Sequence, residues 1–432
     1  GGGGDTIEHE FAVLDPTPAA ARDFVSVEGG NFKLAGKSWY PVGINYWPLY
    51  VSGMDRGDYW AGWMDRRFYD PELVEDDLRR MDELGINMVS IQSHDPVFYR
   101  NLLDFLRRCA VHEIKVNLFC GLASPLAFRE KPLRDFIATA RLQDNATVFA
   151  YDTIWEPGNY VFNQQRRPEW DPRWRDWLAE RYGSVGRAEE DWGVQAPRDD
   201  AGQVVSPPET WFRQDGPWRI CMASYRRFMD DMTSSLWGRA HRTLREMDPN
   251  HLISYRQGNT LPHDFALTGT NRHIDFICPE GYSISNDEGG YNAAGFITRF
   301  IDFTTQGKPI VWSEFGKSVW DSGRMEPGAD AIAVQSEYHD RFYRMVLEGG
   351  ANGTVPWWWP GGYRVGERSD YGIINPDGTP RPCAELLKHY AQDLKTPRER
   401  PAGTVWFDLD LDAHAGGYWH VAFTTGLEAY RS

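Results

Sequence analysis

The sequence predicts an α/β fold: a (β/α)8 TIM barrel with an N-terminal β-hairpin, an insertion after the fourth strand and a short C-terminal β element. From residue 40 onward, short apolar runs alternate with longer amphipathic runs, which gives eight strand–helix steps. The apolar runs show almost no polar alternation, as expected of parallel strands that are covered on both faces. Eight such steps favour a closed barrel over an open doubly wound sheet. No glycine-rich dinucleotide or P-loop motif follows the first strand, which argues against those two ligand classes.

The strands are expected in the apolar runs, at residues 40–47, 87–92, 114–120, 148–156, 251–257, 274–282, 308–316 and 353–359. The amphipathic runs predict helices at residues 70–85, 101–112, 132–142, within 217–248, and near 291–305 and 331–348. The first helix carries the clearest signals, because Asp70 suits the N-cap, Pro71 the first turn and Gly85 the C-terminal end. Its apolar positions follow helical spacing, so that face is expected to lie on the sheet.

Three segments are expected along the chain. Residues 1–30 form an N-terminal segment and the start of a hairpin around Gly29-Gly30, which is expected to close the bottom of the barrel. Residues 31–395 form the barrel, with an insertion at 157–216. Residues 396–432 are expected to form a short β element, because the pattern there alternates and shows no helical spacing.

Charge and composition limit the classes of partner that the chain is expected to bind. The formal net charge is −16, so the chain is expected to repel nucleic acid and anionic membranes and to act on a neutral small molecule or oligosaccharide. A homo-oligomer stays open. No apolar run approaches a membrane span and no signal peptide pattern opens the chain, so a cytoplasmic and a secreted location both stay open.

The chain also lacks the usual signatures of a metal or cofactor site. The five cysteines are scattered and form no CxxC pair, so we expect buried free thiols. No HxH occurs on the first strand, which argues against a metal-dependent barrel hydrolase. No cofactor and no metal are expected.

Two glutamates carry the chemistry of the prediction. In TIM-barrel enzymes the catalytic residues gather at the carboxyl ends of the strands. Glu156 ends the fourth apolar run and Glu314 ends the seventh. One such glutamate alone is more often a salt-bridged or solvated charge, but two on these strands favour the paired carboxylates that cleave a glycosidic bond. Tyr282, from the sixth strand, is expected to donate a hydrogen bond that keeps the nucleophile charged.

Other polar and aromatic residues at the strand ends are candidates for substrate binding. The tryptophan run beside Pro and Gly suits stacking under a sugar, and Glu280 is either a sugar ligand or a rival carboxylate. The His-Asp pair before Pro96 reads equally well as a turn. The complete set is Asn45, Tyr46, Trp47, His94, Asp95, Asn159, Arg256, Gln257, Glu280, Tyr282, Trp357, Trp358 and Trp359. Asp152 lies on the same side of its strand as Glu156 and is expected lower in the barrel, beside a cation.

Several motifs resemble a known group of enzymes. WEP at 155–157 and SEFG at 313–316 resemble the acid/base and nucleophile motifs of glycoside hydrolase clan A, the retaining β-glycosidases on TIM barrels. The run NFKLAGKSWYPVGINYW (31–47) resembles the start of families 2, 5 and 42, and residues 174–193 resemble the insertion of family 42 β-galactosidases. The resemblance covers roughly residues 31 to 394.

This resemblance implies roles for individual residues. Glu156 becomes the acid/base, Glu314 the nucleophile, Tyr282 the partner of the nucleophile, and one of the residues 357–359 the platform under the sugar. The chain departs from the pattern at Trp155, where clan A enzymes usually have an Asn that binds the sugar 2-hydroxyl. It also lacks the strand-two Arg of family 5. The candidates for the contact with the sugar 2-hydroxyl are Asn159, Gln257 and Arg256.

The expected function is that of a retaining exo-acting β-glycosidase. It hydrolyses terminal β-galactosyl, β-mannosyl or β-glucosyl units by a two-carboxylate double displacement. Exo action is expected because the insertion at 157–216 is placed over the mouth of the pocket. An endo-β-glycanase of the mannanase or glucanase type, with an open aromatic groove, is one alternative. A barrel that binds carbohydrate without cleaving it is the other.

Overall fold

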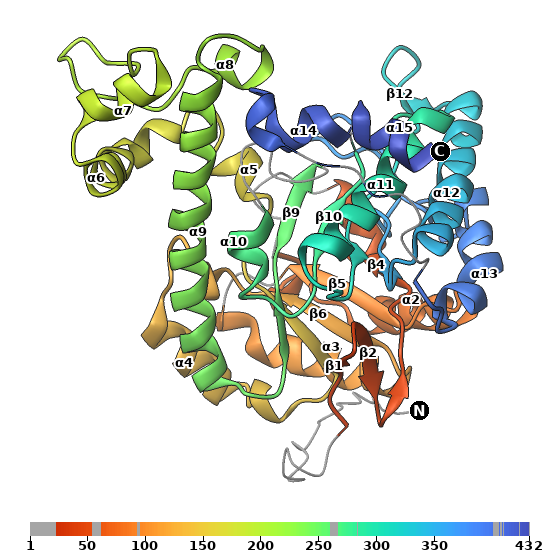
Figure 1. Cartoon of the computed structure of the whole chain (residues 1–432). Helices are drawn as coiled ribbons and strands as arrows, with labels where there is room; N and C mark the ends of the chain where they lie inside the picture. Colours follow the sequence, from red (N-terminus) through yellow and green to blue (C-terminus); the bar gives the residue numbers. More distant parts are fainter. Residues whose placement is uncertain are drawn as a thin grey trace, which may run out of the picture.

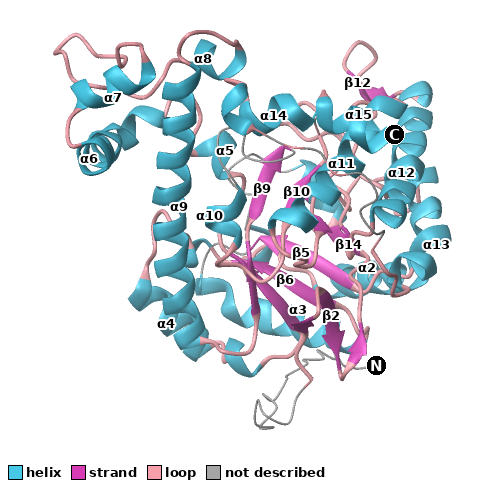
Figure 2. Ribbon diagram, in the orientation of Figure 1, coloured by secondary structure: helices cyan, strands magenta, loops and turns pink. Residues whose placement is uncertain are grey.

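The computed structural model describes residues 23–53, 62–92, 96–259, 267–282, 284–400, 406, 408, 410–422 and 424–431. Within them the chain is a mixed α/β structure in which helices surround a central set of parallel strands (Figures 1 and 2). Five of the strands form one parallel sheet in chain order. They are β4 (Gly43–Asn45), β5 (Met88–Gln92), β6 (Lys115–Phe119), β7 (Val148–Asp152) and β8 (Leu252–Ser254).

The remaining strands continue this arrangement in pairs. The chain passes through Tyr255 from β8 into β9 (Arg256–Asn259), which pairs in parallel with β10 (Cys278–Glu280). Likewise, β11 (Val311–Trp312) pairs in parallel with β14 (Gly353–Thr354). Isolated parallel bridges join the β10 region to the β11 region, at Ile277–Ile310 and Glu280–Glu314, and join Val42, just before β4, to Thr354. The pairings therefore connect all eight segments in which the sequence predicts strands.

Long helices lie on the outside of these strands (Figure 2). They are α2 (Pro71–Leu84), α3 (Tyr99–Val111), α4 (Glu130–Thr139), α9 (Arg219–Met247), α11 (Glu288–Thr304), α12 (Ala329–Gly349) and α13 (Pro382–Lys395). The signals at the ends of α2 act as predicted: the Asp70 carboxylate accepts from the N–H groups of Glu72 and Leu73, and Gly85 takes a left-handed conformation with φ of 76°. None of the described helices is long and apolar enough to cross a membrane.

The segment after β7 forms a helical insertion. It contains α5 (Pro157–Tyr160), α6 (Asp171–Tyr182), α7 (Val185–Trp192) and α8 (Glu209–Arg213). The ring of Trp174 stacks on that of Trp192 at 6.0 Å and meets Phe228 of α9 at 5.2 Å. In Figure 1, α6 and α7 lie beside the first half of α9, whereas α5 lies near β9. Most aromatic side chains of the insertion therefore build its own core.

The N-terminal hairpin is confirmed. The strands β1 (Ser26–Glu28) and β2 (Asn31–Leu34) are antiparallel around Gly29-Gly30, and β3 (Lys37–Ser38) pairs with β2. Phe32 of β2 is fully buried and meets the rings of Phe149 and Phe276 edge to face, at 5.3 and 5.4 Å. This contact places the hairpin against the amino-terminal part of the central strands, where it continues their apolar interior.

The expectation of a C-terminal β element is wrong for the described part of residues 396–432. The chain there forms α14 (Gly417–Ala422) and α15 (Thr425–Arg431). A Cβ atom at Gly295 of α11 would lie 2.3 Å from the ring of Tyr430, so the missing side chain allows α15 to pack closely on α11. Tertiary packing of this kind overrides a local alternating pattern, because a pattern over so few residues is a weak preference. The five cysteines are free and buried, as expected.

Candidate active site

On the inner side of the central strands, the character of the side chains changes along the strand direction. The first inward positions are apolar and include Met88, Leu252 and Val311, which pack in the same cluster as Phe32. Two residues further along the same strands stand Ser90, Ser254 and Ser313, all buried. Because side chains alternate with a period of two, each strand that starts with an inward apolar residue presents its next inward residue one layer higher. The upper layer is therefore polar.

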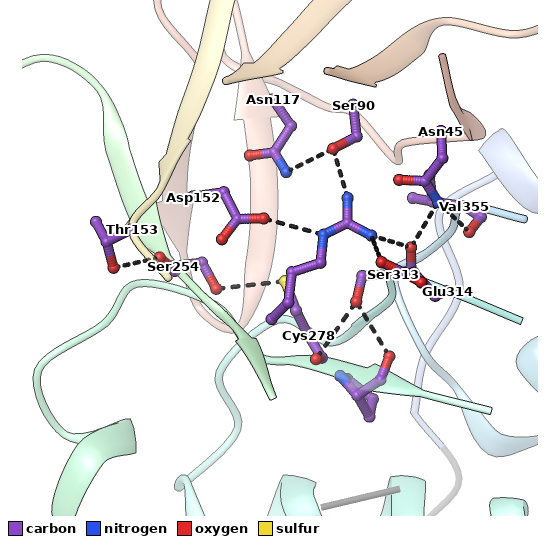
Figure 3. A network of polar contacts seen from close by, with 12 residues as sticks. Asn45, Ser90, Asn117, Asp152, Thr153, Ser254, Cys278, Ser313, Glu314 and Val355 are labelled. Carbon is purple, nitrogen blue, oxygen red and sulfur yellow. Dashed lines mark hydrogen bonds and ion pairs between the residues drawn. The ribbon is translucent and has the colours of Figure 1, made fainter. Parts of the chain in front are cut away.

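Arg256 is the centre of this polar layer. Its guanidinium is fully buried, and each nitrogen binds a different strand. The Nε atom donates to Asp152 Oδ2 at 2.9 Å, and the Nη1 atom donates to Glu314 Oε1 at 2.8 Å and to the Ser313 carbonyl at 2.7 Å. The Nη2 atom donates to the Ser90 hydroxyl. Figure 3 shows these acceptors converging from separate strands. Asp152 thus lies beside a cation, as the sequence predicted, but in the same polar layer as Arg256.

Glu314 receives a donor on each carboxylate oxygen. Arg256 binds Oε1, and the Tyr282 hydroxyl donates to Oε2 at 2.9 Å, which confirms the predicted contact between Tyr282 and Glu314. Burial, opposed by the positive charge of Arg256 and reinforced by the negative charge of Glu156, raises the pKa of Glu314 to about 8. The main chain is also held here, because the Gly281 N–H donates to the Glu314 carbonyl at 2.7 Å.

Glu156 stands at the start of α5, directly after the turn that ends the fourth strand. Its backbone is left-handed, with φ of 42°, a conformation that costs a non-glycine residue about 1–3 kcal/mol and often marks a functional position. The Glu156 N–H donates to the Arg256 carbonyl at 3.1 Å. Gly258 lies against it: a Cβ atom added there would be 3.7 Å from Glu156 Cβ. The fourth and fifth strands therefore fix this glutamate together.

Glu280 is a third carboxylate in the same place. It ends β10, forms a parallel bridge with Glu314, and is fully buried. Apart from the neighbouring Glu156 carboxyl, no group of the described residues forms a hydrogen bond with either carboxyl oxygen. Burial, followed by the negative charges of Glu314 and Glu156, raises the pKa of Glu280 well above its ordinary value. The shift follows from three carboxyl groups that share one low-dielectric space, which favours the protonated form of Glu280.

Trp155 occupies the position before Glu156 and covers the polar layer. Its ring centroid is 4.1 Å from the Arg256 Cζ atom, a cation–π contact. Phe119 and Trp357 meet the same ring edge to face, at 5.6 and 5.9 Å. Trp357 is thus the member of the tryptophan run that lies next to the site. The neighbouring Trp358 stacks on Trp357 at 5.2 Å.

Three predicted binding residues face away from the polar layer. The Tyr46 hydroxyl donates to Asp77 of α2 at 3.1 Å. Burial raises the pKa of Asp77 to about 6, and Trp359 and Tyr46 oppose this shift, which places Trp359 on the same outer side. The Gln257 amide donates to Asn271, at the end of α10 (Leu267–Asn271), at 2.8 Å. All three belong to the packing between strands and helices, and the two neighbours Arg256 and Gln257 point to opposite sides of their strand.

The remaining predicted residues divide into two groups. Asn45 faces the interior, but its amide nitrogen is bound to the carbonyls of Ser313, Val355 and Pro356, at 3.0, 3.3 and 3.1 Å, so it links strands. Trp47 and Trp358 are buried against each other, with ring centroids 5.2 Å apart. His94 and Asp95 lie outside the described residues, as does the side chain of Asn159.

The sequence analysis missed the hydroxyl and amide groups that complete the polar layer. Ser90 accepts from Arg256 and also from the Asn117 amide at 3.2 Å. The Ser254 hydroxyl donates to the Phe276 carbonyl at 2.6 Å. A signal existed for Ser90 and Ser254, because each follows an inward apolar residue by two positions, but a lone serine or asparagine inside a strand is rarely singled out. In the described part of the chain no three His, Cys, Asp or Glu side chains are arranged to hold a metal ion.

Comparisons with solved structures show the same kind of fold. The beta-galactosidase of the Antarctic haloarchaeon Halorubrum lacusprofundi matches with a TM-score of 0.56 at 15% identity, over 82% of this chain and 58% of that one. The beta-galactosidase of the psychrophilic Marinomonas ef1 matches with a TM-score of 0.55 at 15% identity, over 82% of this chain and 59% of that one. The chain therefore spans less than two thirds of the length of either beta-galactosidase.

A third solved structure is similar over most of both chains. It is the GH5_18 protein of Streptomyces cattleya in complex with GlcNAc, with a TM-score of 0.52 at 10% identity, over 84% of this chain and 82% of that one. No curated protein matches the sequence.

The sequence also matches a family model. Residues 124–339, half of the chain, match the model of glycoside hydrolase family 42, which is described as beta-galactosidase. The matched range contains both glutamates, Tyr282 and Arg256. This confirms the resemblance carried by the WEP and SEFG motifs, and the chain belongs to glycoside hydrolase family 42 of clan A.

Proposed function

We propose that this chain is a retaining β-glycosidase that removes terminal β-galactosyl units, with Glu314 as the nucleophile and Glu156 as the acid/base. Family membership supports the reaction class and the galactosyl unit. We also infer that the eight strand segments close into one (β/α)8 barrel, since the bridge from Val42 to Thr354 links the last segment to the first. The two glutamates then stand at the carboxyl ends of strands four and seven, where barrel enzymes carry their chemistry.

The observation that carries the assignment is the difference between the two glutamates. Glu314 has a guanidinium on one oxygen and a phenol hydroxyl on the other, both of which stabilise the ionised carboxylate that a nucleophile needs. Glu156 has its main chain fixed by Arg256 and Gly258, and its negative charge raises the pKa of Glu314. Two interacting carboxyl groups in different surroundings separate into a charged and a protonated partner.

The reaction then follows in two displacements. The Glu156 carboxyl gives its proton to the glycosidic oxygen while a Glu314 oxygen forms a bond to the anomeric carbon and the bond to the leaving group breaks. Tyr282 and Arg256 hold Glu314 during this attack. Water next attacks the anomeric carbon, the Glu156 carboxylate accepts its proton, and the bond to Glu314 breaks. Two inversions give a product that retains the β configuration.

Two further groups are proposed to bind the sugar. Glu280 lies beside both catalytic carboxyl groups, and no group of the described residues other than the Glu156 carboxyl binds its oxygens, so we assign it the acceptance of a hydrogen bond from a sugar hydroxyl. Trp357, which borders Trp155, supplies the aromatic platform. Exo action on a terminal unit is part of this proposal, and β-mannosyl or β-glucosyl units, endo cleavage of a glycan, and binding without cleavage are its competitors.

The decisive experiment combines two variants with one stereochemical measurement. Glu314→Gln and Glu156→Gln are each expected to lower kcat on an aryl β-galactoside by at least about 10²-fold. Azide is expected to restore turnover of an activated substrate only in the Glu156 variant, because azide replaces water once the glycosyl–enzyme bond has formed. Glu169→Gln, on the exposed surface of the insertion, is the matched control and keeps the wild-type rate.

The anomeric form of the first product, followed by NMR, completes the test. Retention is expected, whereas inversion removes the double displacement. Release of monosaccharide without shortening of polysaccharides supports exo action, and the opposite pattern supports the endo alternative. Wild-type rates in either glutamate variant overturn the assignment of the catalytic pair.

A further inference from the structure

Arg256 touches both glutamates, through different atoms. Its side chain binds the Glu314 carboxylate, and its main chain brackets the segment that carries Glu156: the Arg256 N–H donates to the Ile154 carbonyl and its carbonyl accepts from the Glu156 N–H, both at 3.1 Å. Trp155 lies between these two backbone contacts and folds its ring onto the guanidinium. One residue of the fifth strand is therefore in contact with both halves of the proposed catalytic pair.

We propose that Arg256 and Trp155 form a positioning pair that aims Glu314 and keeps it ionised: the guanidinium binds the carboxylate, and the indole ring shields the guanidinium from solvent. This inference rests on the proposed function. It concerns two positioning residues, which act through Glu314. It also gives a reason for the tryptophan before Glu156, since an amide in that position has no flat face with which to cover a guanidinium.

The geometry of the guanidinium supports the aiming role. Its Nε, Nη1 and Nη2 atoms are bound by Asp152, Glu314 and Ser90, which come from separate strands. A planar group held at three corners cannot rotate, so the oxygen that it binds has one defined position. Ser90, the third of these partners, lies on β5. A lysine ammonium at the same place is a point charge and leaves the orientation of the carboxylate free.

The packing of Trp155 supports the shielding role. Its ring meets the edges of Phe119 and Trp357, so the indole is wedged between the ends of other strands. A cation–π contact is stronger for a desolvated guanidinium than at an exposed site. Removing the ring while keeping Arg256 lets water reach the guanidinium and weakens its effect on Glu314.

The charges around Glu314 make this cation necessary. Facing it are Glu280 and Tyr282 from the β10 segment, Glu156 from the start of α5 and Glu367 from a later loop, while Asp152 of β7 shares the guanidinium. All of these except Tyr282 are carboxyl groups, and Tyr282 lowers the pKa of Glu314 by its hydrogen bond. Arg256 is the cation that binds Glu314 in the described part of the chain. Without its charge the pKa of Glu314 rises, so protonated Glu314 persists to higher pH.

The test uses a reaction that reports on Glu314 alone. An activated 2-deoxy-2-fluoro β-galactoside traps the glycosyl–enzyme bond, and the pH dependence of the trapping rate follows the ionisation of the nucleophile. Arg256→Gln is expected to move the acid limb of this profile up by about 1 pH unit or more, and to slow trapping at its optimum. Arg256→Lys keeps the positive charge, so the acid limb of its profile moves less. Its trapping rate still falls, because a lysine lacks the planar set of N–H donors that orients the carboxylate.

Variants of Trp155 separate shielding from packing. Trp155→Phe keeps an aromatic face and is expected to give a profile close to wild type. Trp155→Leu is expected to move the acid limb in the same direction as Arg256→Gln, by a smaller amount. Because Trp155→Leu leaves every charged residue in place, it also tests the proposal if the Arg256 variants do not fold.

A second buried ion pair provides the matched control. Arg381 donates to both oxygens of Asp370 at 2.9 and 2.7 Å, and both residues are buried. Arg381→Lys is expected to lower stability and to leave the acid limb unchanged. The proposal is overturned if the acid limb of the trapping-rate profile does not move in folded Arg256→Gln and Trp155→Leu. It is also overturned if Arg381→Lys moves this limb by the same amount. A wild-type protein that cleaves no aryl β-glycoside overturns the proposed function as well, and that result is distinct from an active enzyme whose limb does not move.

Discussion

Glu280 and Asp370 are two fully buried carboxylates with opposite surroundings. Asp370 is bound on both oxygens by Arg381, whereas among the described residues no cation and no donor other than the Glu156 carboxyl binds Glu280. A glutamine amide cannot ionise, so Glu280→Gln removes the cost of holding an ionisable carboxyl in this buried, negatively charged place. We therefore predict that Glu280→Gln raises the free energy of unfolding near neutral pH. The matched change Asp370→Asn is expected to lower it there by about 3–5 kcal/mol, because Arg381 is left buried without a counter-charge.

The size of the Glu280 effect depends on pH in a defined direction. Burial and the charges of Glu314 and Glu156 raise its pKa above the ordinary value of 4.5, so the folded protein keeps a proton that the unfolded chain releases. The stability of the wild type therefore falls as pH rises from the unfolded pKa towards the folded one, by at most about 1.4 kcal/mol for each pH unit. Glu280→Gln removes this loss, so its advantage over the wild type grows with pH.

Urea unfolding of both proteins at several values between about pH 5 and pH 7, without ligand, measures the difference directly. The same preparations are assayed with an aryl β-galactoside, where Glu280→Gln is expected to show a lower kcat/KM because the proposed contact with a sugar hydroxyl changes. Higher stability with lower activity is the expected combination for a group retained for function. A stability difference that is constant over this pH range, or a variant less stable than the wild type at its upper end, refutes the reasoning.

Two further predictions concern residues away from the proposed chemistry. Burial lowers the pKa of His339 to about 3, so the unfolded chain takes up a proton that the folded protein refuses, and stability is lost as pH falls below 6.5. His339→Phe is expected to gain up to about 2 kcal/mol over the wild type near pH 5 relative to neutral pH in urea unfolding, and an equal difference at both pH values contradicts it. Gly85 has φ of 76°, and a Cβ atom there would lie 2.8 Å from Ala391 Cβ. Gly85→Ala is expected to lower the free energy of unfolding by about 1–3 kcal/mol with kcat unchanged. Unchanged stability contradicts this prediction, because it shows that α2 and α13 can move apart without a loss of free energy.

The parts of the fold that follow from the sequence are those with strong local signals. The first helix carries a capping aspartate, a proline in its first turn and a terminal glycine, and α2 begins and ends within one residue of the prediction. The hairpin follows from Gly29-Gly30, because both residues take positive φ. The C-terminal segment has no such punctuation, and its helices are set by close packing on α11, a contact between residues far apart in the chain.

The site shows the same division within a single strand. Arg256 and Gln257 are neighbours with equal claims as sugar ligands in the sequence, but one points into the interior and the other towards α10. The phase of alternation is set by the neighbouring strands. Since the chain changes pairing at Tyr255, between β8 and β9, counting along the sequence does not carry the phase across. The serine and asparagine groups around the guanidinium escape prediction for a related reason, because their role exists only once four strands are side by side.

By itself, the sequence determined the order of strands and helices, the family, and the two glutamates at the ends of the fourth and seventh apolar runs, because these depend on local pattern and on short motifs. Only the tertiary structure decided what surrounds them. It brought Glu280 beside both glutamates, turned Tyr46 and Trp359 towards α2, and placed Arg256 under the ring of Trp155. The physical reason is that charge interactions and ring contacts act over a few ångströms between residues that are far apart in the sequence, so they are settled by strand pairing.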